Sequence, residues 1–477
     1  MTIRSLGSAN ALRAMRHRNF RLFFGGQAVS LVGSWMQSVA QAWLVLTLTN
    51  DPLMLGVVAA AQWTPVLLLG LFGGLIADAL PKRPTLIAVE AAMATLAIVL
   101  GVLTLTGIVE VWMILVLAVL LGCVNAIEMP VRQAFAVEMV GREDVVNAIA
   151  LNSATFNAAR VIGPAIAGVT IAVFDISIAF FLNGLSFVAV IVGLLLMRAE
   201  ELRTPPPIPR PNGVRGVVAS VGEGISYSRR TPSVLLPVVV VGLAATIGMN
   251  FQVTIPPFAR DVLGGDAATF GFLMTASGLG SVAAALFLAT RRRPSPWAIA
   301  WGAAMLGLGL LVVAAIPVFA VALPALAFTG FGAIWMAANG NTLIQATVPD
   351  ELRGRVISVY TTVFAGSTPL GALFAGFIAS TWGPVAALLV GGILTTAVGG
   401  SALLWLRAHP AAARPNFPRS GSALPAAPLP AAHLRATPGT PATTPASPAT
   451  PATPAVQVAA SPAALGTLRD APPRGGG

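Results

Sequence analysis

Three ionisable residues lie inside long apolar stretches of the chain, where a charged side chain is expensive. Arg160 is near the middle of the stretch 147–168, Glu90 lies about two helical turns into an earlier stretch, and Glu128 lies near the end of another. An arginine at mid-bilayer depth costs roughly 2.5 to 3.5 kcal/mol, so such residues usually face a protein interior or a water-filled path. A carboxylate can carry a proton if its proton affinity changes with its neighbours and its access to water. We therefore predict that Glu90 and Glu128 titrate and that Arg160 is their electrostatic partner.

Amide side chains in the apolar stretches offer a second kind of chemistry, the binding of a polar ligand. Gln37 and Gln41 are four residues apart, which places them on one face of a helix. Asn157, Asn250 and Asn339 are similar amides in later stretches. A polar stripe in a lipid-embedded helix should face protein or water. These five residues either line a substrate cavity or form hydrogen bonds between helices, which contribute about 0.6 kcal/mol on average.

A glycine, an aspartate and two basic residues lie close together in the segment GGLIADALPKRP, residues 73–84. Gly74 would let two helices approach closely, and Asp78 could sit against a helix N-terminus. Lys82 and Arg83 would anchor this turn at the cytoplasmic face. The segment predicts a conformational latch on that side of the membrane.

Arg132 extends this predicted latch, because it follows Glu128 by four residues and can pair with it on a helix. Asp78, Glu128 and Arg132 could hold the two halves of the protein together until the cavity opens inward. Glu128 could therefore serve in the latch or in proton transfer, and the same two roles are open for Glu90.

Gly163 and Pro164 interrupt the apolar stretch that carries Arg160. Proline removes one backbone donor, so a neighbouring helix must satisfy the carbonyl that it leaves unpaired. The pair is predicted to act as a hinge between two conformations, with a simple packing kink as the alternative.

The composition indicates which class of protein must position these residues. The 477 residues are 56% hydrophobic and 9% charged, which is typical of a chain that crosses a membrane many times. The net charge of +11 comes from residues in short segments between apolar runs, so it reports topology and gives no reason to expect nucleic-acid binding. One cysteine and three histidines, all three outside the apolar runs, favour neither a metal site nor a cofactor.

Charged residues delimit the apolar runs, and about 20 residues are needed to cross the hydrocarbon core. The pattern predicts an all-α integral membrane protein with twelve transmembrane helices. A turn at Ile316-Pro317 must separate the ninth span from the tenth, because the uncharged run there is too long for one helix. The expected spans are 20–48, 53–77, 84–107, 111–130, 145–173, 176–197, 233–257, 267–290, 297–316, 320–345, 356–381 and 384–406.

Lys and Arg residues set the orientation, because cytoplasmic loops hold them in excess. When alternate loops are compared, one side receives nearly all of them and the other receives only Arg260. Both termini are therefore expected in the cytoplasm. The expected parts are a cytoplasmic N-terminal segment at 1–19, an N-terminal six-helix half at 20–197, a cytoplasmic central loop at 198–232, a C-terminal six-helix half at 233–407 and a disordered Pro/Ala/Thr-rich cytoplasmic tail at 408–477.

Two segments resemble a known family. GGLIADALPKRP is similar to the loop signature of the major facilitator superfamily, with Ala79 and Pro81 where the family often has Arg and Gly. The segment PVRQAFAVEMVGREDVVNAIALNSATFNAARVIGPAIAG, residues 130–168, resembles the drug:proton antiporter-3 branch, which includes enterobactin exporter-like and macrolide efflux proteins. The resemblance covers residues 10–407 and implies a two-domain, twelve-helix fold, export from the cytoplasm and coupling to the proton gradient.

The expected function is secondary active efflux of a small amphipathic organic compound such as a drug, siderophore or metabolite, by proton-coupled antiport and alternating access. No Walker-type phosphate loop is present, which argues against a self-contained ATP-driven pump. A transporter-like sensor or scaffold is the main alternative. A lipid-modifying membrane enzyme is less favoured, since no acid, base or ligand cluster marks one membrane face. The expected partners are the substrate, protons and the bilayer of the cell inner (plasma) membrane, crossed many times by a monomer.

Overall fold

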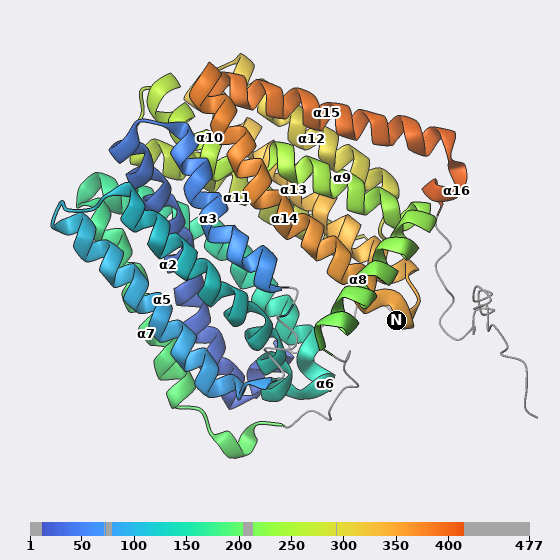
Figure 1. Cartoon of the computed structure of the whole chain (residues 1–477), viewed down its shortest axis with the longest axis horizontal. Helices are drawn as coiled ribbons and strands as arrows, with labels where there is room; N and C mark the ends of the chain where they lie inside the picture. The colour runs from blue at the N-terminus through green and yellow to red at the C-terminus, as the bar shows by residue number, and fades with distance from the viewer. Residues whose placement is uncertain (1–11, 71, 73–78, 204–212, 292, 415–477) are drawn as a thin grey trace, which may run out of the picture. The chain divides into compact units, whose positions relative to one another are not determined.

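The computed structural model describes residues 12–70, 72, 79–203, 213–291 and 293–414, and every regular element in these ranges is a helix (Figure 1). The long helices are α2 (Arg18–Thr49), α3 (Pro52–Gly70), α5 (Lys82–Leu105), α6 (Val111–Val173), α7 (Ile176–Leu195), α9 (Pro232–Gly248), α11 (Ala267–Ala289), α12 (Pro296–Ala315), α13 (Phe319–Thr347), α14 (Asp350–Trp382) and α15 (Pro384–Ala408). The remaining helices are η2 (Arg13–Arg16), η3 (Ala199–Glu201), α8 (Gly213–Arg230), α10 (Phe251–Pro257), η4 (Phe258–Val262) and α16 (Pro410–Ala413).

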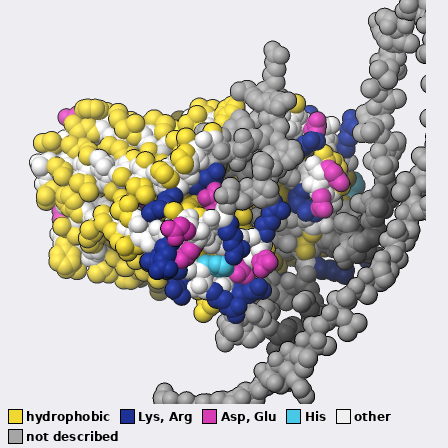
Figure 2. Space-filling model, turned by 90° about the horizontal axis from the view of Figure 1, so that it is seen from below, with side chains coloured by type: hydrophobic (Ala, Val, Ile, Leu, Met, Phe, Trp, Pro, Cys, Tyr) yellow, Lys and Arg dark blue, Asp and Glu magenta, His cyan; other side chains and the backbone are white. Residues whose placement is uncertain are grey.

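Within the described part of the chain, eleven helices are long and apolar enough to cross a membrane, counting α9 to η4 as one. Hydrophobic side chains cover the flank of the protein, while Lys, Arg, Asp and Glu side chains gather at one end (Figure 2). Leu185, Leu286 and Leu370 are among the large apolar side chains that remain exposed. Apolar surface of this extent is rare on soluble monomers, so this flank faces lipid.

The helix α6 is long because it joins two helical stretches at Gly141. Gly141 has φ 75° and ψ 175°, a conformation essentially restricted to glycine, and the Arg203 guanidinium packs where a Cβ atom would project. The helix extends beyond the predicted fourth span, 111–130, and continues through Pro130 to this break. Arg132 therefore lies on the same helix as Glu128, one turn further on.

A second break divides the predicted span 233–257. The helix α9 ends at Gly248, and α10 starts at Phe251 after Met249 and Asn250 leave the helical conformation. The chain then continues through two prolines into the π-helical turn η4. Turns of this type often mark functional positions in helices. The predicted turn at Ile316-Pro317 is present, since α12 ends at Ala315 and α13 begins at Phe319.

The N-terminal helices, α2 to α7, contact the C-terminal helices, α9 to α15, mainly along α3 with α14 and α6 with α11 (Figure 1). Glycines make close approaches to the backbone of the other group. Gly56 on α3 lies against the Ala372 carbonyl group on α14, and Gly271 on α11 lies against the Pro164 carbonyl group on α6. These contacts involve the early part of α3, the late part of α6, the early part of α11 and the late part of α14, which share one end of the bundle.

At that end Arg260 connects the two groups of helices directly. Its Nη1 donates to the Leu46 carbonyl oxygen and to Asn50 Oδ1, both at 3.0 Å. Asn50 has a left-handed backbone with φ 54° and caps the C-terminus of α2. The Arg260 end of the bundle, formed by the last turn of α2, the first turn of α3 and η4, is thus held closed by hydrogen bonds to a charged group.

Candidate substrate cavity and proton site

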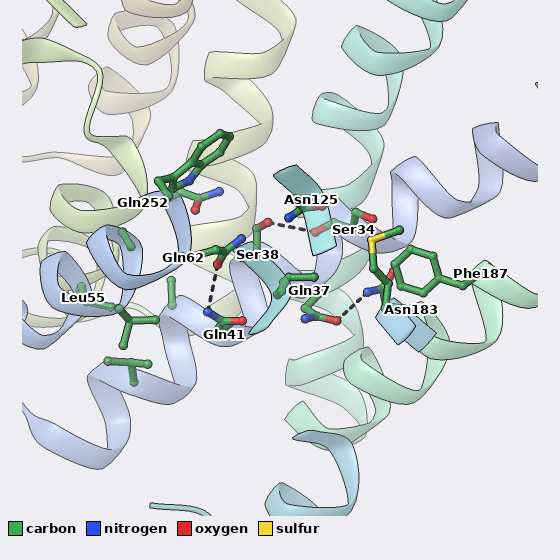
Figure 3. Close-up of a pocket in the computed structure, with 17 residues that line it drawn as sticks. Ser34, Gln37, Ser38, Gln41, Leu55, Gln62, Asn125, Asn183, Phe187 and Gln252 are labelled. Atoms are coloured by element: carbon green, nitrogen blue, oxygen red, sulfur yellow. Dashed lines mark hydrogen bonds between the residues drawn. The ribbon is translucent and has the colours of Figure 1, made fainter. Parts of the chain in front are cut away.

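A cavity opens among the N-terminal helices and is lined mainly by amide, hydroxyl and aromatic side chains (Figure 3). Gln37 Oε1 accepts a hydrogen bond from Asn183 Nδ2 of α7 at 2.6 Å. Gln41 Nε2 donates to Gln62 Oε1 of α3 at 3.4 Å. Because these bonds join three different helices, they fix the directions in which the amide groups face the cavity.

Gln37 and Gln41 line this cavity, and both are buried, with Gln37 7% and Gln41 9% exposed; that the cavity holds the substrate stays a prediction. The residues around them come from α2, α3, α5, α6, α7 and α10. The amide lining residues that sequence reasoning did not single out are Gln62, Asn125, Asn183 and Gln252. Each is an isolated amide in an apolar run, so the argument that identified Gln37 could have found them.

The cavity continues towards the charged end as far as Glu90, Glu128 and Arg132. The two parts share Ser34, Ser38, Gln62, Trp63, Met93, Asn125, Phe187 and Gln252, so they form one continuous space. Glu90 is 1% exposed and Glu128 is 4% exposed. The amide region and the carboxylate region can thus be reached by one ligand.

The two carboxylates differ in their partners. Arg132 Nη1 lies 3.1 Å from Glu128 Oε1, at the i to i+4 spacing predicted from the sequence. Glu90 has no ion pair among the described residues, and both of its buried oxygens lack a hydrogen-bond donor. Burying an unpaired charge costs far more than burying a paired one. Glu90 is therefore the more sensitive of the two to a proton or a cation.

Arg160 lies behind the cavity wall and faces an aromatic ring. Its Cζ is 5.6 Å from the centre of the Trp35 ring, a cation–π distance, and Trp35 packs edge to face on Phe156 at 5.6 Å. Trp35 and Phe156 both line the cavity. No carboxylate of a described residue lies within ion-pair distance of Arg160, so in this conformation Arg132 takes the place beside Glu128 that was predicted for Arg160.

The structure places the other three predicted cavity residues away from the lining of this cavity. Asn157 Nδ2 donates to the Ser153 carbonyl oxygen of its own helix at 2.8 Å. Asn250 Nδ2 donates to the Thr246 carbonyl oxygen at 2.8 Å and marks the break between α9 and α10. Asn339 is 2% exposed and bonds backbone groups of Trp335 and Ser295, which joins α13 to the start of α12. Their polar groups stabilise helices in this conformation.

The described members of the predicted latch bond within the N-terminal helices. Lys82 Nζ lies 3.7 Å from Glu138 on α6. Arg83 donates to the Leu194 and Leu195 carbonyl oxygens at the end of α7, at 2.9 and 3.1 Å. These bonds hold α5, α6 and α7 together and do not reach the C-terminal helices.

Two further latch residues, Gly74 and Asp78, lie outside the described residues. The predicted hinge, Gly163 and Pro164, lies in a continuous part of α6, where Gly163 packs against Trp35 and the backbone of Met36. The close packing there leaves no room for a Cβ atom at Gly163.

The chain matches the sequence model of the family described as transmembrane secretion effector over residues 9–424. It is 24% identical to the staphyloferrin A transporter of Staphylococcus aureus over 79% of this chain and 94% of that protein. It is 28% identical to the multidrug efflux pump Tap of Mycolicibacterium fortuitum over 74% of this chain and 87% of that protein.

Among solved structures, a bacterial homolog of the human lysosomal transporter Spinster, in an inward-facing and occupied conformation, matches with a TM-score of 0.64 at 12% identity, over 83% of this chain and 97% of that chain. This likeness shows the fold, and the family match confirms the resemblance found in the sequence. The chain belongs to the transmembrane secretion effector family of the major facilitator superfamily and is a multi-pass membrane transporter, not an enzyme.

Proposed function

We propose that this protein is a secondary active efflux transporter that exchanges a small amphipathic organic compound for protons. The observation that carries the proposal is the continuous cavity in which bonded amide side chains lead to a buried, unpaired carboxyl group. Amides can orient a polar substrate, and an unpaired buried carboxyl group can take up and release a proton. Both events in one space would let proton and substrate binding influence each other.

We propose Glu90 as the proton carrier. No described cation pairs with it, so its charge in this conformation would be uncompensated, and a bound proton removes that cost. For exchange, Glu90 must take up the proton while the cavity is open to the outside and release it to the cytoplasm, where hydration or a bound substrate compensates the charge of the carboxylate. Glu128 keeps its charge partner Arg132, which suits it to a structural role beside the carrier.

Alternating access is supported by the position of the contacts between the two groups of helices. The Arg260 end is closed by hydrogen bonds between η4 and α2. A transporter of this kind must break such contacts to open that end. We propose that the conformation seen here is open towards the opposite end and that rocking of the two groups exposes the cavity in turn.

We infer twelve crossings in the plasma membrane, because the break at Gly141 divides α6 into two stretches that are each long enough to span. Arg13, Lys82, Arg142 and Arg198 lie at helix ends on the side opposite Arg260. The positive-inside rule then places that side, and both termini, in the cytoplasm. The six-helix halves are 20–197 and 233–407, and the protein functions as a monomer.

The names of the relatives support export of organic compounds, since one is a siderophore transporter and another a multidrug efflux pump. The test compares bacterial cells that express the wild-type protein, the Glu90→Gln variant, or neither. We expect the wild type to raise tolerance to some antibiotics or dyes, or to raise the amount of a secreted metabolite, and Glu90→Gln to lose that effect at equal membrane levels. Identical tolerance and secretion in all three strains would contradict export.

A further inference from the structure

The cavity holds an excess of hydrogen-bond acceptors around Glu90. Gln27 Oε1 and both carboxylate oxygens of Glu90 are buried without a donor, and both residues line the same cavity. Gln27 is 4% exposed and Glu90 is 1% exposed. Glu128 Oε1 in the same cavity also accepts no hydrogen bond, but it lies 3.1 Å from Arg132 Nη1. Buried polar atoms without a partner are few in folded proteins, so the three that have neither a donor nor a charge partner indicate a bound group that supplies the missing donors.

No described residue donates a hydrogen bond to these oxygens. Arg132 is the one Lys or Arg among the residues lining this part of the cavity, and its guanidinium group already lies beside Glu128. Among the nearby hydroxyl groups, Ser38 donates to the Ser34 carbonyl oxygen at 3.0 Å. The charges of Glu128 and Arg132 offset each other, so ionised Glu90 leaves the site one negative charge in excess.

The walls of the same space are aromatic. Trp35, Trp63, Phe156 and Phe187 line it, and Trp35 already presents its ring to the cation of Arg160. Aromatic faces attract cations and pack well against apolar or aromatic ligand bodies. The site thus combines an apolar wall with a negative group that needs donors.

We propose that the substrate of this cavity is an amphipathic organic cation with an ammonium N–H group, which donates to Glu90 and Gln27 while its apolar body packs on the aromatic wall. The proposal rests on the proposed function and specifies its substrate class. The ammonium group and the proton compete for the same carboxylate, so one must leave before the other binds. A quaternary cation without N–H would leave these oxygens without a donor, and a neutral ligand would leave the charge of Glu90 uncompensated.

The test measures binding, so that it does not depend on transport. The probes are dansylcadaverine, which ends in a primary ammonium group, its N-acetyl derivative, which is neutral, and its N,N,N-trimethyl derivative, which is a cation without N–H. Purified full-length protein in lipid nanodiscs is titrated with each probe, and dansyl fluorescence reports binding. A hydrogen bond to a charged group contributes more than one between neutral groups. We therefore expect the ammonium probe to bind at least about tenfold more tightly than the N-acetyl probe, and the affinity of the trimethyl probe to lie between the two.

Two variants and one control locate the site. Glu90→Gln should weaken the ammonium probe about tenfold or more and leave the N-acetyl probe unchanged, which also shows that the variant is folded. Gln27→Met should reduce the advantage of the ammonium over the trimethyl probe. Glu223→Gln, on the exposed helix α8 outside the cavity, is the matched control and should bind all probes as the wild type does.

Equal affinity for the three probes, no binding by any of them, or an unchanged ammonium preference in Glu90→Gln would overturn the substrate class. These outcomes would leave export of another compound intact. Conversely, ammonium-selective binding by a protein that exports nothing would support this inference and contradict the proposed function.

Discussion

Replacing Arg260 by Ala should favour the conformation in which the Arg260 end is open. The side chain joins the two groups of helices through the Leu46 carbonyl oxygen and Asn50 Oδ1, each at 3.0 Å. Asp261 fixes the guanidinium group through an ion pair at 2.6 Å. Because the alanine variant loses both cross-group bonds without creating a buried cavity, its main effect falls on the equilibrium between conformations.

The magnitude follows from the bonds that are lost. A hydrogen bond to a charged group contributes about 1.5 to 3 kcal/mol when shielded from water. The Arg260 side chain is 25% exposed, so solvent screening reduces the value. A total of about 1 to 3 kcal/mol corresponds to a shift of roughly 5- to 150-fold in the ratio of the two conformations.

The assay is a distance measurement across the Arg260 end by double electron–electron resonance. Spin labels at Leu48→Cys and Leu263→Cys, in a Cys123→Ser background, report the separation of α2 and η4. The Arg260→Ala variant should gain a population at longer distance. Arg355→Ala is the matched control, because Arg355 bonds Glu223 on α8 within the C-terminal part of the chain. An unchanged distance distribution in Arg260→Ala, or an equal change in the control, would refute the reasoning.

Three further predictions concern other parts of the chain. Arg160→Ala should abolish efflux while the protein still inserts into the membrane. Arg160→Lys should retain part of the efflux, because it keeps a cation over Trp35. Dye accumulation in cells measures the efflux, and the amount of protein in the membrane measures insertion. Gly141→Ala should destabilise the protein by about 1 to 3 kcal/mol, seen as a lower thermal unfolding temperature, because the backbone there suits only glycine. Asp266→Ala should cost about 1 kcal/mol at pH 7, since Asp266 caps α11. The Thr269 backbone amide holds the pKa of Asp266 below its ordinary value, so this contribution should be lost as the pH falls through that lowered pKa, and unfolding temperatures at pH 7 and pH 3 should show it.

Many helix ends could be predicted from the sequence because charged residues lie near the ends of the apolar runs, as Asp51 does between α2 and α3. The turn between α12 and α13 was predicted from Ile316-Pro317 alone. A break between residues 130 and 145 was predicted, but its position at Gly141 was not, and the break at Asn250 was missed. Glycine is frequent in these helices, and nothing in the local sequence distinguishes Gly141 from the others. Its conformation accompanies a tertiary contact, because Arg203 packs against it.

Only those features of the candidate site that depend on residues within one helix could be predicted from the sequence. Periodicity along α2 placed Gln37 and Gln41 on one face, and the i to i+4 spacing paired Glu128 with Arg132. The neighbours of Arg160 were not predictable, because hydropathy gives the depth of a residue and says nothing of which helix it faces. The contact with Trp35 depends on the packing of α6 against α2.

Transport driven by a proton gradient tests the central claim most directly. Purified protein is reconstituted in proteoliposomes with a compound identified from the tolerance and secretion comparison, and a pH gradient is imposed across the membrane. We predict accumulation against the concentration gradient of that compound, above protein-free liposomes, that stops when nigericin collapses the pH gradient and is absent in Glu90→Gln. Accumulation that continues after the pH gradient is collapsed would contradict proton-coupled export.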